Sequence, residues 1–230
     1  MTMNEVLEMS SVFKSYGGGG TERVRVLEGV NMNIYPGDKA FLVGPSGSGK
    51  STVLNIAAGL VKADSGSVKL CGVDLNEASY STLLELRRRR IGYVFQRFNL
   101  VYGLTVEENV ILPSLLVGGS RSQAHARCRK LLEAVDMVGK INVDVSSLSR
   151  GEQQRVAICR AFMNEPSIVL ADEPTGNLDE RNARLFMELL CGMVEATGCA
   201  AVVATHNLAL LEYGNRVLTL KGGIIREEVR

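Results

Sequence analysis

The chain has 230 residues, with 26 basic and 25 acidic side chains and a formal net charge of +1. This balance gives no global electrostatic case for a nucleic-acid partner, and no apolar run of eighteen residues is present that could span a membrane. The five cysteines are scattered without a C-x-x-C pair, which argues against a cysteine-built metal site and favours reduced thiols in a cytoplasmic protein. This length suits one mid-sized domain or a core with a small inserted subdomain.

The first segment, residues 3–35, shows the alternation typical of β-strands. Its apolar residues recur on an even period, at Val24, Val26, Val30, Met32 and Ile34. Four glycines at 17–20 predict a mobile hairpin tip between two strands. Tyr16, directly before them, is either an ordinary strand aromatic or a ring that stacks on a base.

A phosphate-binding loop follows a turn at residues 35–38. Residues 39–43 predict a short apolar strand, and residues 52–58 predict a helix that stops at Gly59. Glycines let backbone N–H groups turn inward around an anion, and a helix N-terminus adds partial positive charge. Lys50 can then reach the β- and γ-phosphates of a nucleotide, and the Ser51 hydroxyl can ligate Mg²⁺. The loop, a G-x-x-x-x-G-K-[ST] sequence, consists of Gly44, Pro45, Ser46, Gly47, Ser48, Gly49, Lys50, Ser51 and Thr52.

Beyond the loop helix, residues 63–66 predict a turn and residues 67–75 predict a β-hairpin. Residues 79–90 predict a helix that ends in four consecutive arginines, Arg87–Arg90. Such a run either meets phosphates or forms a solvated helix end, where cations suit the C-terminal dipole. We favour the solvated helix end.

The middle of the chain changes character and predicts an all-helical insertion between strands. Residues 91–95 indicate a strand that leads into Gln96. Acidic residues in the first turn open a helix at Thr105, and residues 120–137 predict a longer amphipathic helix. His125 has no motif around it and is assigned to the surface of that helix.

A capping box opens the next helix, with Ser149 at the N-cap and Glu152 three residues later. This helix is predicted to run through about residue 163 and to stop before Pro166. Residues 167–171 form a continuous apolar run, as expected of a strand buried on both faces of a parallel sheet. That strand ends in Asp172 and Glu173.

The last third predicts a helix at 181–197, a buried strand at 199–205 that ends at His206, and a terminal hairpin at 216–226. Strands therefore alternate with helices, which indicates the α/β class. The polar residues Gln96, Asp172, Glu173 and His206 all follow strands. In open parallel sheets this carboxyl edge is where ligands bind.

With these motifs in order, residues 7–225 resemble the ATPase subunit of ABC transporters. A phosphate loop alone indicates only an NTPase, but a capping-box segment directly before an Asp-Glu strand is highly specific. The resemblance implies a RecA-like P-loop NTPase core at 1–96 and 165–230, with an N-terminal antiparallel β subdomain and an α-helical subdomain inserted at 97–164. The motifs that carry it are residues 44–52, Gln96 after 93–95, residues 148–152, 168–174, 176–179 and 204–206.

The resemblance also implies the roles of single residues in ATP hydrolysis. Asp172, Gln96 and Ser51 would hold Mg²⁺, and Glu173 would be the general base that polarises the attacking water. His206 would contact the γ-phosphate and fix the water and the base. Tyr16 stands at the adenine-stacking position of the family.

In the family, the capping-box segment completes the nucleotide site of an opposite subunit, so that two chains sandwich two ATP molecules head to tail. Ser149, Gly151, Glu152 and Asp179 would therefore act in the site of a second copy. One departure is Arg150, where the family usually has glycine. That arginine either clashes with the close approach of the two chains or adds a cation near the γ-phosphate.

Three stretches are similar to the group that serves macrolide exporters, lipoprotein-release complexes and the cell-division transporter-like pair. They are residues 90–100 and residues 104–113, together with 171–179. This implies a separate integral-membrane permease and a place on the cytoplasmic face of the cell membrane. Exposed residues in Phe98–Tyr102 would contact the permease, or they pack the helical insertion instead. The alternative function is a nucleotide-switched regulatory module of the cell-division type, without true transport.

Overall fold

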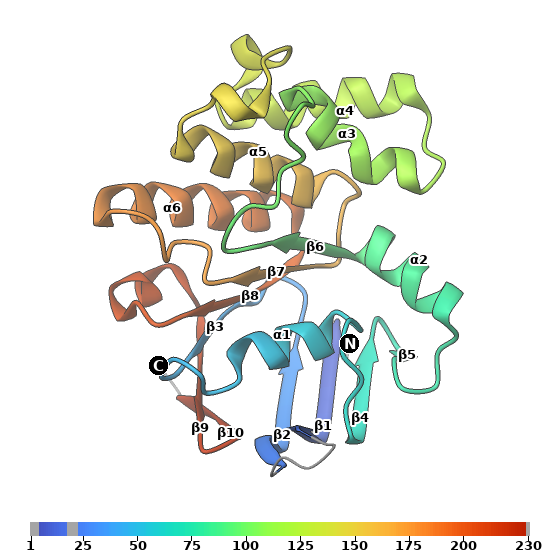
Figure 1. Cartoon of the computed structure of the whole chain (residues 1–230), viewed down its shortest axis with the longest axis vertical. Coiled ribbons are helices and arrows are strands. Elements are labelled where there is room, and N and C mark those ends of the chain that lie inside the picture. The colour runs from blue at the N-terminus through green and yellow to red at the C-terminus, as the bar shows by residue number, and fades with distance from the viewer. Residues whose placement is uncertain (1–4, 18–22, 229–230) are drawn as a thin grey trace.

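The structure is a computed structural model that describes residues 5–17 and 23–228. Its centre is a six-stranded sheet in which every neighbouring pair is parallel except the terminal hairpin. Figure 1 shows this sheet across the middle of the molecule, with helices on both sides. The strands run in the order β10 (Ile224–Glu228), β9 (Arg216–Lys221), β3 (Lys39–Val43), β8 (Ala200–Thr205), β7 (Ile168–Asp172) and β6 (Ile91–Val94).

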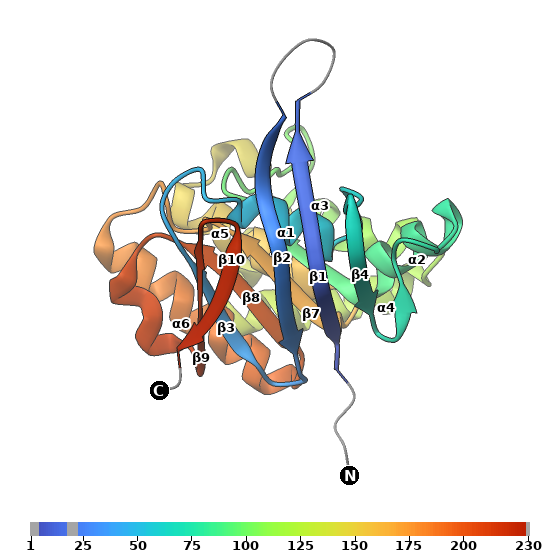
Figure 2. The same cartoon turned by 90° about the horizontal axis from the view of Figure 1, so that it is seen from below.

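A second, antiparallel sheet covers one face of the first. Figure 2 shows it lying over helix α1 (Lys50–Ala57), which is sandwiched between the two sheets. The hairpin at the C-terminal end is tied to this sheet where the Glu28 N–H donates to the Gly223 carbonyl at 2.8 Å. The strand order is β2 (Val24–Ile34), β1 (Leu7–Tyr16), β4 (Ser65–Leu70) and β5 (Val73–Asp74).

The opposite face of the central sheet carries the helical layers. Helix α6 (Glu180–Thr197) lies directly on the sheet, and the insertion between β6 and β7 stands beyond it (Figure 1). Its helices are α3 (Val106–Leu116), α4 (Arg121–Ala134) and α5 (Arg150–Phe162), with α2 (Tyr80–Arg90) beside it. Short 3-10 turns lie at Val138–Lys140, Val145–Ser147 and Leu208–Tyr213. Within the described residues no helix is long and apolar enough to cross a membrane.

Two hydrophobic cores form because successive strand residues point to opposite faces. In β7, Ile168 and Leu170 enter the core shared with α1 and the antiparallel sheet. Val169 and Ala171 enter the core shared with α6 and the insertion. All four are fully buried, which explains why this strand has no polar alternation.

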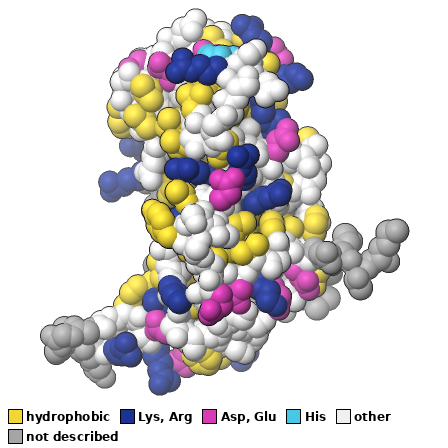
Figure 3. All heavy atoms as spheres, turned by 90° about the vertical axis from the view of Figure 1, so that its right-hand side faces the viewer, with side chains coloured by type: hydrophobic (Ala, Val, Ile, Leu, Met, Phe, Trp, Pro, Cys, Tyr) yellow, Lys and Arg dark blue, Asp and Glu magenta, His cyan; other side chains and the backbone are white. Residues whose placement is uncertain are grey.

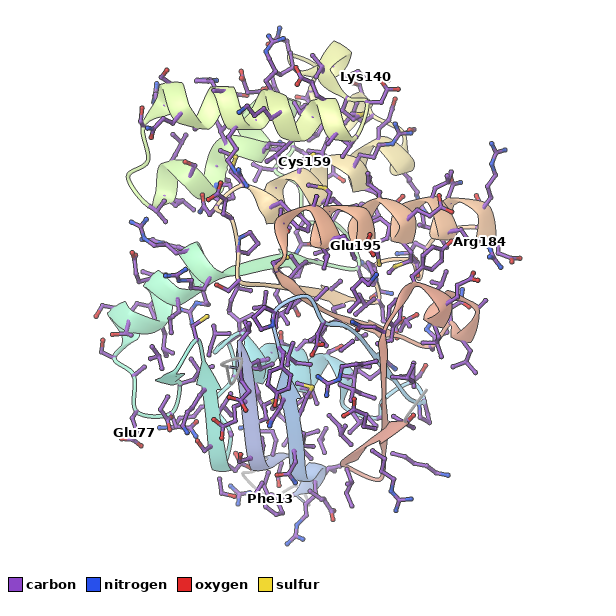
Figure 4. The ribbon with its side chains drawn as sticks, turned by 180° about the vertical axis from the view of Figure 1, so that it is seen from behind. Phe13, Glu77, Lys140, Cys159, Arg184 and Glu195 are labelled. Atoms are coloured by element: carbon purple, nitrogen blue, oxygen red, sulfur yellow. The ribbon has the colours of Figure 1, made fainter. Side chains whose placement is uncertain are left out.

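The cysteines are free, as the sequence predicts, and four of the five are buried. Figure 4 places Cys159 inside the helical insertion and Lys140 at its outer end. Burial raises the pKa of Cys128 to about 12, so its thiol stays protonated near neutral pH. His125 is exposed, as expected, and its Nδ1 lies 2.7 Å from Glu107 Oε1.

The sequence-based elements are confirmed with shifted ends. Strand β4 begins at Ser65, inside the segment expected to be a turn, and α4 is shorter than predicted. The even apolar period of β2 is wrong at its start: Val24 is 63% exposed, while Leu27 is buried. Irregular pairing with β1 changes the register between these residues, so the buried face switches phase. The predicted glycine tip lies partly outside the described residues, and the division at 97 and 164 stays a prediction.

Gly92 in β6 offers a test of how closely the insertion packs on the sheet. A Cβ at this position would lie 2.4 Å from the carbonyl oxygen of Ala161 in α5. We expect Gly92→Ala to lower the free energy of unfolding by about 2 kcal/mol, because α5 would have to move. Urea denaturation measures this loss.

The matched control is Gly192→Ala, which adds the same methyl group in the middle of α6. No atom lies within 4 Å of its would-be Cβ. We expect this variant to be unchanged or stabilised by up to about 1 kcal/mol, because alanine favours a helix over glycine. An equal loss in both variants would contradict the close contact at Gly92.

Candidate nucleotide-binding site

The phosphate loop connects β3 to α1 and leaves the start of that helix open. Gly49 is its N-cap, with φ at 104°, and no side chain caps the first turn. The first turn has no acidic residue, so its backbone N–H groups are available to an anion. A Cβ on Gly49 would lie 2.7 Å from Val26 Cγ1, so only glycine permits the loop to rest against β2.

Lys50 is held at the centre of this loop. Its side chain is only 6% exposed, and its ammonium donates to the carbonyls of Gly44 at 2.9 Å and Pro45 at 3.2 Å. The same Nζ lies 3.3 Å from Glu173 Oε1. The lysine therefore joins the phosphate loop to the residue that follows β7.

Asp172 ends β7 directly beside the loop. Ser51 Oγ donates a hydrogen bond of 3.0 Å to Asp172 Oδ1. Burial is the main cause that raises the pKa of Asp172, and the neighbouring Glu173 charge adds to it, against the opposing effects of Ser51 and Lys50. A hydroxyl and a desolvated carboxylate in contact form an oxygen donor pair of the kind that hard cations prefer.

Glu173 lies between a cation and an imidazole. Its Oε2 is 2.8 Å from His206 Nδ1, while its Oε1 faces Lys50. The backbone of Glu173 is in the left-handed region, with φ at 45°, and its N–H donates to the carbonyl of Ala204 at 3.0 Å. Such a backbone costs about 1–3 kcal/mol for a residue with a side chain, and functional sites retain it where it aims a group.

Gln96 and Tyr16 lie at the border of this cluster. A Cβ on Gly176 would be 3.3 Å from Gln96 Nε2, so the amide lies beside the loop that follows Glu173. Tyr16 is 44% exposed at the end of β1, and Lys14 Nζ lies 5.5 Å from its ring centroid. Its strand partner is Val24, in the same strand that supports Gly49. An exposed ring at this corner can stack on a base.

The capping-box segment lies elsewhere in the chain. Ser149 and Glu152 form the predicted capping box at the start of α5, and Lys140 pairs with the second oxygen of Glu152. These bonds lower the pKa of Glu152 to about 2. No Cβ clash surrounds Gly151, and Arg150 is exposed. Both carboxylate oxygens of Glu152 are thus used to shape the helix start.

Asp179 likewise has a local task, since it caps α6 and accepts from the Asn182 N–H at 2.9 Å. Among the described residues, no hydrogen bond or ion pair joins Ser149, Glu152 or Asp179 to the phosphate loop. Helices α1 and α5 lie on opposite faces of the central sheet. The structure therefore unites the phosphate loop, Asp172, Glu173 and His206, and leaves the capping-box segment separate.

Only part of the expected permease surface near Phe98–Tyr102 is exposed, and the contact itself stays a prediction. Phe98 and Leu100 are 7% and 8% exposed and belong to the core of the insertion, while Val101 and Tyr102 are exposed. Phe98 and Asn99 both have positive φ, at 59° and 47°. The side chains of Phe98 and Leu100 turn inward into the hydrophobic core that α5 shares.

Sequence reasoning missed Arg160, which holds this loop. Its guanidinium on α5 donates to the carbonyls of Asn99, at 2.6 Å, and of Phe98. Burial lowers the pKa of Arg160, so its charge is stabilised by these carbonyl dipoles rather than by water. One side chain thereby joins the helix that begins at Ser149 to the loop that begins at Gln96. The sequence did contain a signal for this role, because Arg160 is a basic residue within an otherwise apolar stretch of α5.

The donor set fits Mg²⁺ and a nucleoside triphosphate. The loop offers an uncapped helix start, a buried ammonium and the Ser48 hydroxyl, which is buried without a partner among the described residues. Ser51 and Asp172 offer the oxygen pair. These are the groups that phosphate charge and a hard cation require.

Comparison with known proteins decides the family. The ABC transporter family model matches residues 27–176. The chain belongs to the ABC transporter family. It is 42% identical to the lipoprotein-releasing system ATP-binding protein LolD of Roseobacter denitrificans, covering 96% of this chain and 97% of that protein. It is 39% identical to the macrolide export ATP-binding/permease protein MacB of Mannheimia succiniciproducens, of which it spans 35%.

Solved structures agree with this family. The ATP-binding cassette MJ0796 in a dimeric post-hydrolysis state, bound to ADP and Pi, superposes with a TM-score of 0.87 at 38% identity, covering 97% of this chain and 98% of that one. The RecA-like fold predicted from the sequence is confirmed. This member of the ABC transporter family is an ATP-binding, ATP-hydrolysing cassette.

Arg160 should act as a positioning residue for hydrolysis. Arg160→Lys keeps the charge but cannot donate to both carbonyls from one rigid group, so the loop after Gln96 loosens. We expect kcat to fall about tenfold, since small misplacements of a reacting group are costly. The affinity for ATP should hold, because the phosphate loop is untouched. Turnover and fluorescent-nucleotide titration measure the two quantities.

The matched control is Arg155→Lys on the same helix, where Arg155 makes one bond of 3.3 Å to the carbonyl of Val135. Its kcat should stay near that of the parent chain. Equal losses of kcat in the two variants, or a parallel loss of ATP affinity, would contradict a specific role for Arg160.

Proposed function

We propose that two copies of this chain close head to tail around two ATP molecules and thereby power an integral-membrane permease. The observation that carries this proposal is the separation of the two half-sites within one chain. Ser149 and Lys50 stand on helices at opposite faces of the sheet, so a complete enclosure of the nucleotide requires a second copy. MJ0796, with the same fold, is dimeric with ADP and Pi.

In this proposal, each active site draws residues from both copies. The phosphate loop, Lys50 and Tyr16 bind ATP in one copy, while Ser149, Gly151, Glu152 and Asp179 of the other complete the enclosure. Since the Glu152 carboxylate is occupied by Ser149 and Lys140, its part is to hold the helix start in shape. The start of α5 then presents N–H groups to the nucleotide.

In the hydrolytic step, Glu173 acts as the general base. Its Oε2 can accept a proton from water, and His206 orients that carboxylate through Nδ1. Ser51, Asp172 and Gln96 are the proposed ligands of Mg²⁺. A bound Mg²⁺ would neutralise phosphate charge as the bond to the γ-phosphate breaks. Lys50 would exchange the carbonyls of Gly44 and Pro45 for phosphate oxygens.

The permease is proposed to dock in an apolar groove of about 290 Å³ between the core and the insertion. This groove extends the expected surface near Phe98–Tyr102, since Asn99 lines it. It is adjacent to the Gln96 loop, because Asn99 and Arg160 line it. Its apolar wall is made by Ile91, Tyr93, Phe95, Leu112, Pro113 and Leu116. Motion at the groove would thus reach Gln96 through the bonds of Arg160.

We place the chain on the cytoplasmic side of the cell membrane, attached through its permease. The names LolD and MacB favour lipoprotein release or export. A third possible output is mechanotransmission, in which ATP hydrolysis moves an extracytoplasmic part of the permease. A cell-division type of regulatory module would use the same nucleotide switch. A permease partner that moves no substrate would favour this second function.

The first test is the oligomeric state of Glu173→Gln. This variant should bind ATP, fail to hydrolyse it, and shift from monomer to dimer, because the enclosed nucleotide persists when the base is lost. Size exclusion with light scattering, with and without ATP, measures the shift. Adding Ser149→Arg should return it to monomer, since that side chain occupies the shared interface.

Two results would contradict the assignments. An unchanged turnover rate in Glu173→Gln would overturn the general base. A variant that binds ATP yet stays monomeric would mean that the pair does not close alone. Arg150→Gly in the same background would then show whether the arginine at the seam is the obstacle.

Lys50→Ala tests the phosphate loop itself. We expect loss of ATP binding, because this variant removes the buried ammonium group of Lys50 from the phosphate loop. Glu173 would also lose its cation, so the variant without nucleotide should not be more stable than the parent chain. Nucleotide fluorescence and thermal melting measure both effects. Undiminished ATP affinity would contradict the assignment of Lys50.

A further inference from the structure

Strand β6 leads into Gln96 and lies at the edge of the central sheet. Within residues 5–17 and 23–228, its main-chain ladder joins it to one neighbour, β7. Figure 3 views the molecule from the side where α2 leads into β6, and hydrophobic side chains lie there among basic ones. Gln96 itself is exposed. The position of Gln96 relative to the phosphate loop therefore depends on the side-chain contacts that hold β6.

A side-chain hydrogen bond ties this strand to helix α1. Tyr93 Oη donates to Asn55 Oδ1 at 3.3 Å. Among the residues that the structure describes, this is the one side-chain hydrogen bond between α1 and β6. Tyr93 packs against the core that contains α1, and its ring stacks on Phe95 with centroids 4.3 Å apart. Burial raises the pKa of Tyr93, and the charge of Asp172 adds to it, so the hydroxyl stays protonated and acts as the donor.

Asn55 stands one turn beyond Ser51 on α1. Residues four apart lie on one face of a helix, so the two side chains leave α1 on the same side. Ser51 Oγ donates to Asp172 Oδ1 on β7, and Asn55 accepts from Tyr93 on β6. The main chain of Asn55 is bonded as well, since its carbonyl accepts from the Leu60 N–H at 2.8 Å. One face of α1 is thereby joined to two neighbouring strands.

The three proposed Mg²⁺ ligands lie on the elements that these bonds connect: Ser51 on α1, Asp172 at the end of β7 and Gln96 after β6. The bond between Ser51 and Asp172 joins two of these ligands, whose oxygens would turn to a bound cation. The bond between Tyr93 and Asn55 contains no ligand and can persist. We infer that Tyr93 and Asn55 are positioning residues that hold Gln96 in place relative to Ser51 for Mg²⁺ coordination. The inference rests on the proposed function and adds two residues that act through Gln96.

A role in packing alone predicts a different result. Phenylalanine at position 93 keeps the ring and its stack on Phe95, so Tyr93→Phe removes the hydrogen bond and leaves the packing intact. In a packing role, ATP binding with and without Mg²⁺ would change together or not at all. In a positioning role, only the part that depends on Mg²⁺ changes, because the contacts of Lys50 with the phosphate loop are untouched.

The experiment measures the affinity of the full chain for a fluorescent ATP analogue, once in EDTA and once in Mg²⁺. All variants are made in the Glu173→Gln background, so that hydrolysis does not interfere. The ratio of the two dissociation constants reports what the cation adds to binding. We expect Tyr93→Phe to lower this ratio about fivefold, which is the size of the net contribution of one hydrogen bond. The affinity in EDTA should stay unchanged, and Asn55→Ala should have the same effect.

Two comparisons assign the effect to this one bond. The double variant Tyr93→Phe/Asn55→Ala should show no further loss, because the two residues act through a shared contact. The matched control is Tyr35→Phe, which removes a hydroxyl that donates to Glu5 Oε1, also at 3.3 Å. Tyr35 precedes β3, whereas the phosphate loop follows it, so this variant should keep the parent ratio. Thermal melting confirms that each variant is folded.

Three results would overturn the inference. An unchanged ratio in folded Tyr93→Phe removes the positioning role. A fall of the same size in Tyr35→Phe assigns the loss to a general loosening of the fold. A parallel loss of affinity in EDTA and in Mg²⁺ places the effect on the phosphate loop instead.

The parent background is a separate reading. Failure of the Glu173→Gln chain to bind ATP would overturn the proposed function, and binding without any gain from Mg²⁺ would overturn the proposed Mg²⁺ ligands together with the inference. A parent chain that binds ATP and gains from Mg²⁺, with variants that behave like it, overturns only the roles of Tyr93 and Asn55.

Discussion

Burial of the parallel sheet on both faces is the constraint on which the rest of the structure depends. Strands such as β7 can be apolar throughout only if layers cover both sides, and the chain supplies α1 on one side and α6 with the insertion on the other. Polar and charged side chains can then be placed only where the strands end. Asp172, Glu173 and His206 meet there because β7 and β8 are neighbours that run in the same direction.

Charge in this edge is balanced locally. Lys50 compensates Glu173, Ser51 donates to Asp172, and His206 holds the second oxygen of Glu173. The same contacts restrict each group to a small range of positions without nucleotide. In the proposed function, nucleotide binding would exchange one set of partners for another instead of ordering a loose site, which would keep the entropic cost of binding small.

The sequence was sufficient for the core of the site and insufficient for its surroundings. Lys50, Asp172, Glu173 and His206 are fixed by short motifs at strand ends, so their grouping follows from topology. The inward turn of Phe98 was not predictable, because it depends on two positive φ values and on Arg160, 62 residues away along the chain. Likewise, the exposure of Val24 depends on a register shift between β1 and β2 that apolar periodicity does not record.

Glu173 has a left-handed backbone, a conformation that is strained for a residue with a side chain. Glycine or asparagine would occupy this backbone with less strain, and the N–H bond to Ala204 would survive either change. That relief is opposed, because removing the carboxylate would leave the buried Lys50 ammonium without its ion-pair partner. A change at 173 therefore exchanges relief of backbone strain for the loss of the contacts with Lys50 and His206.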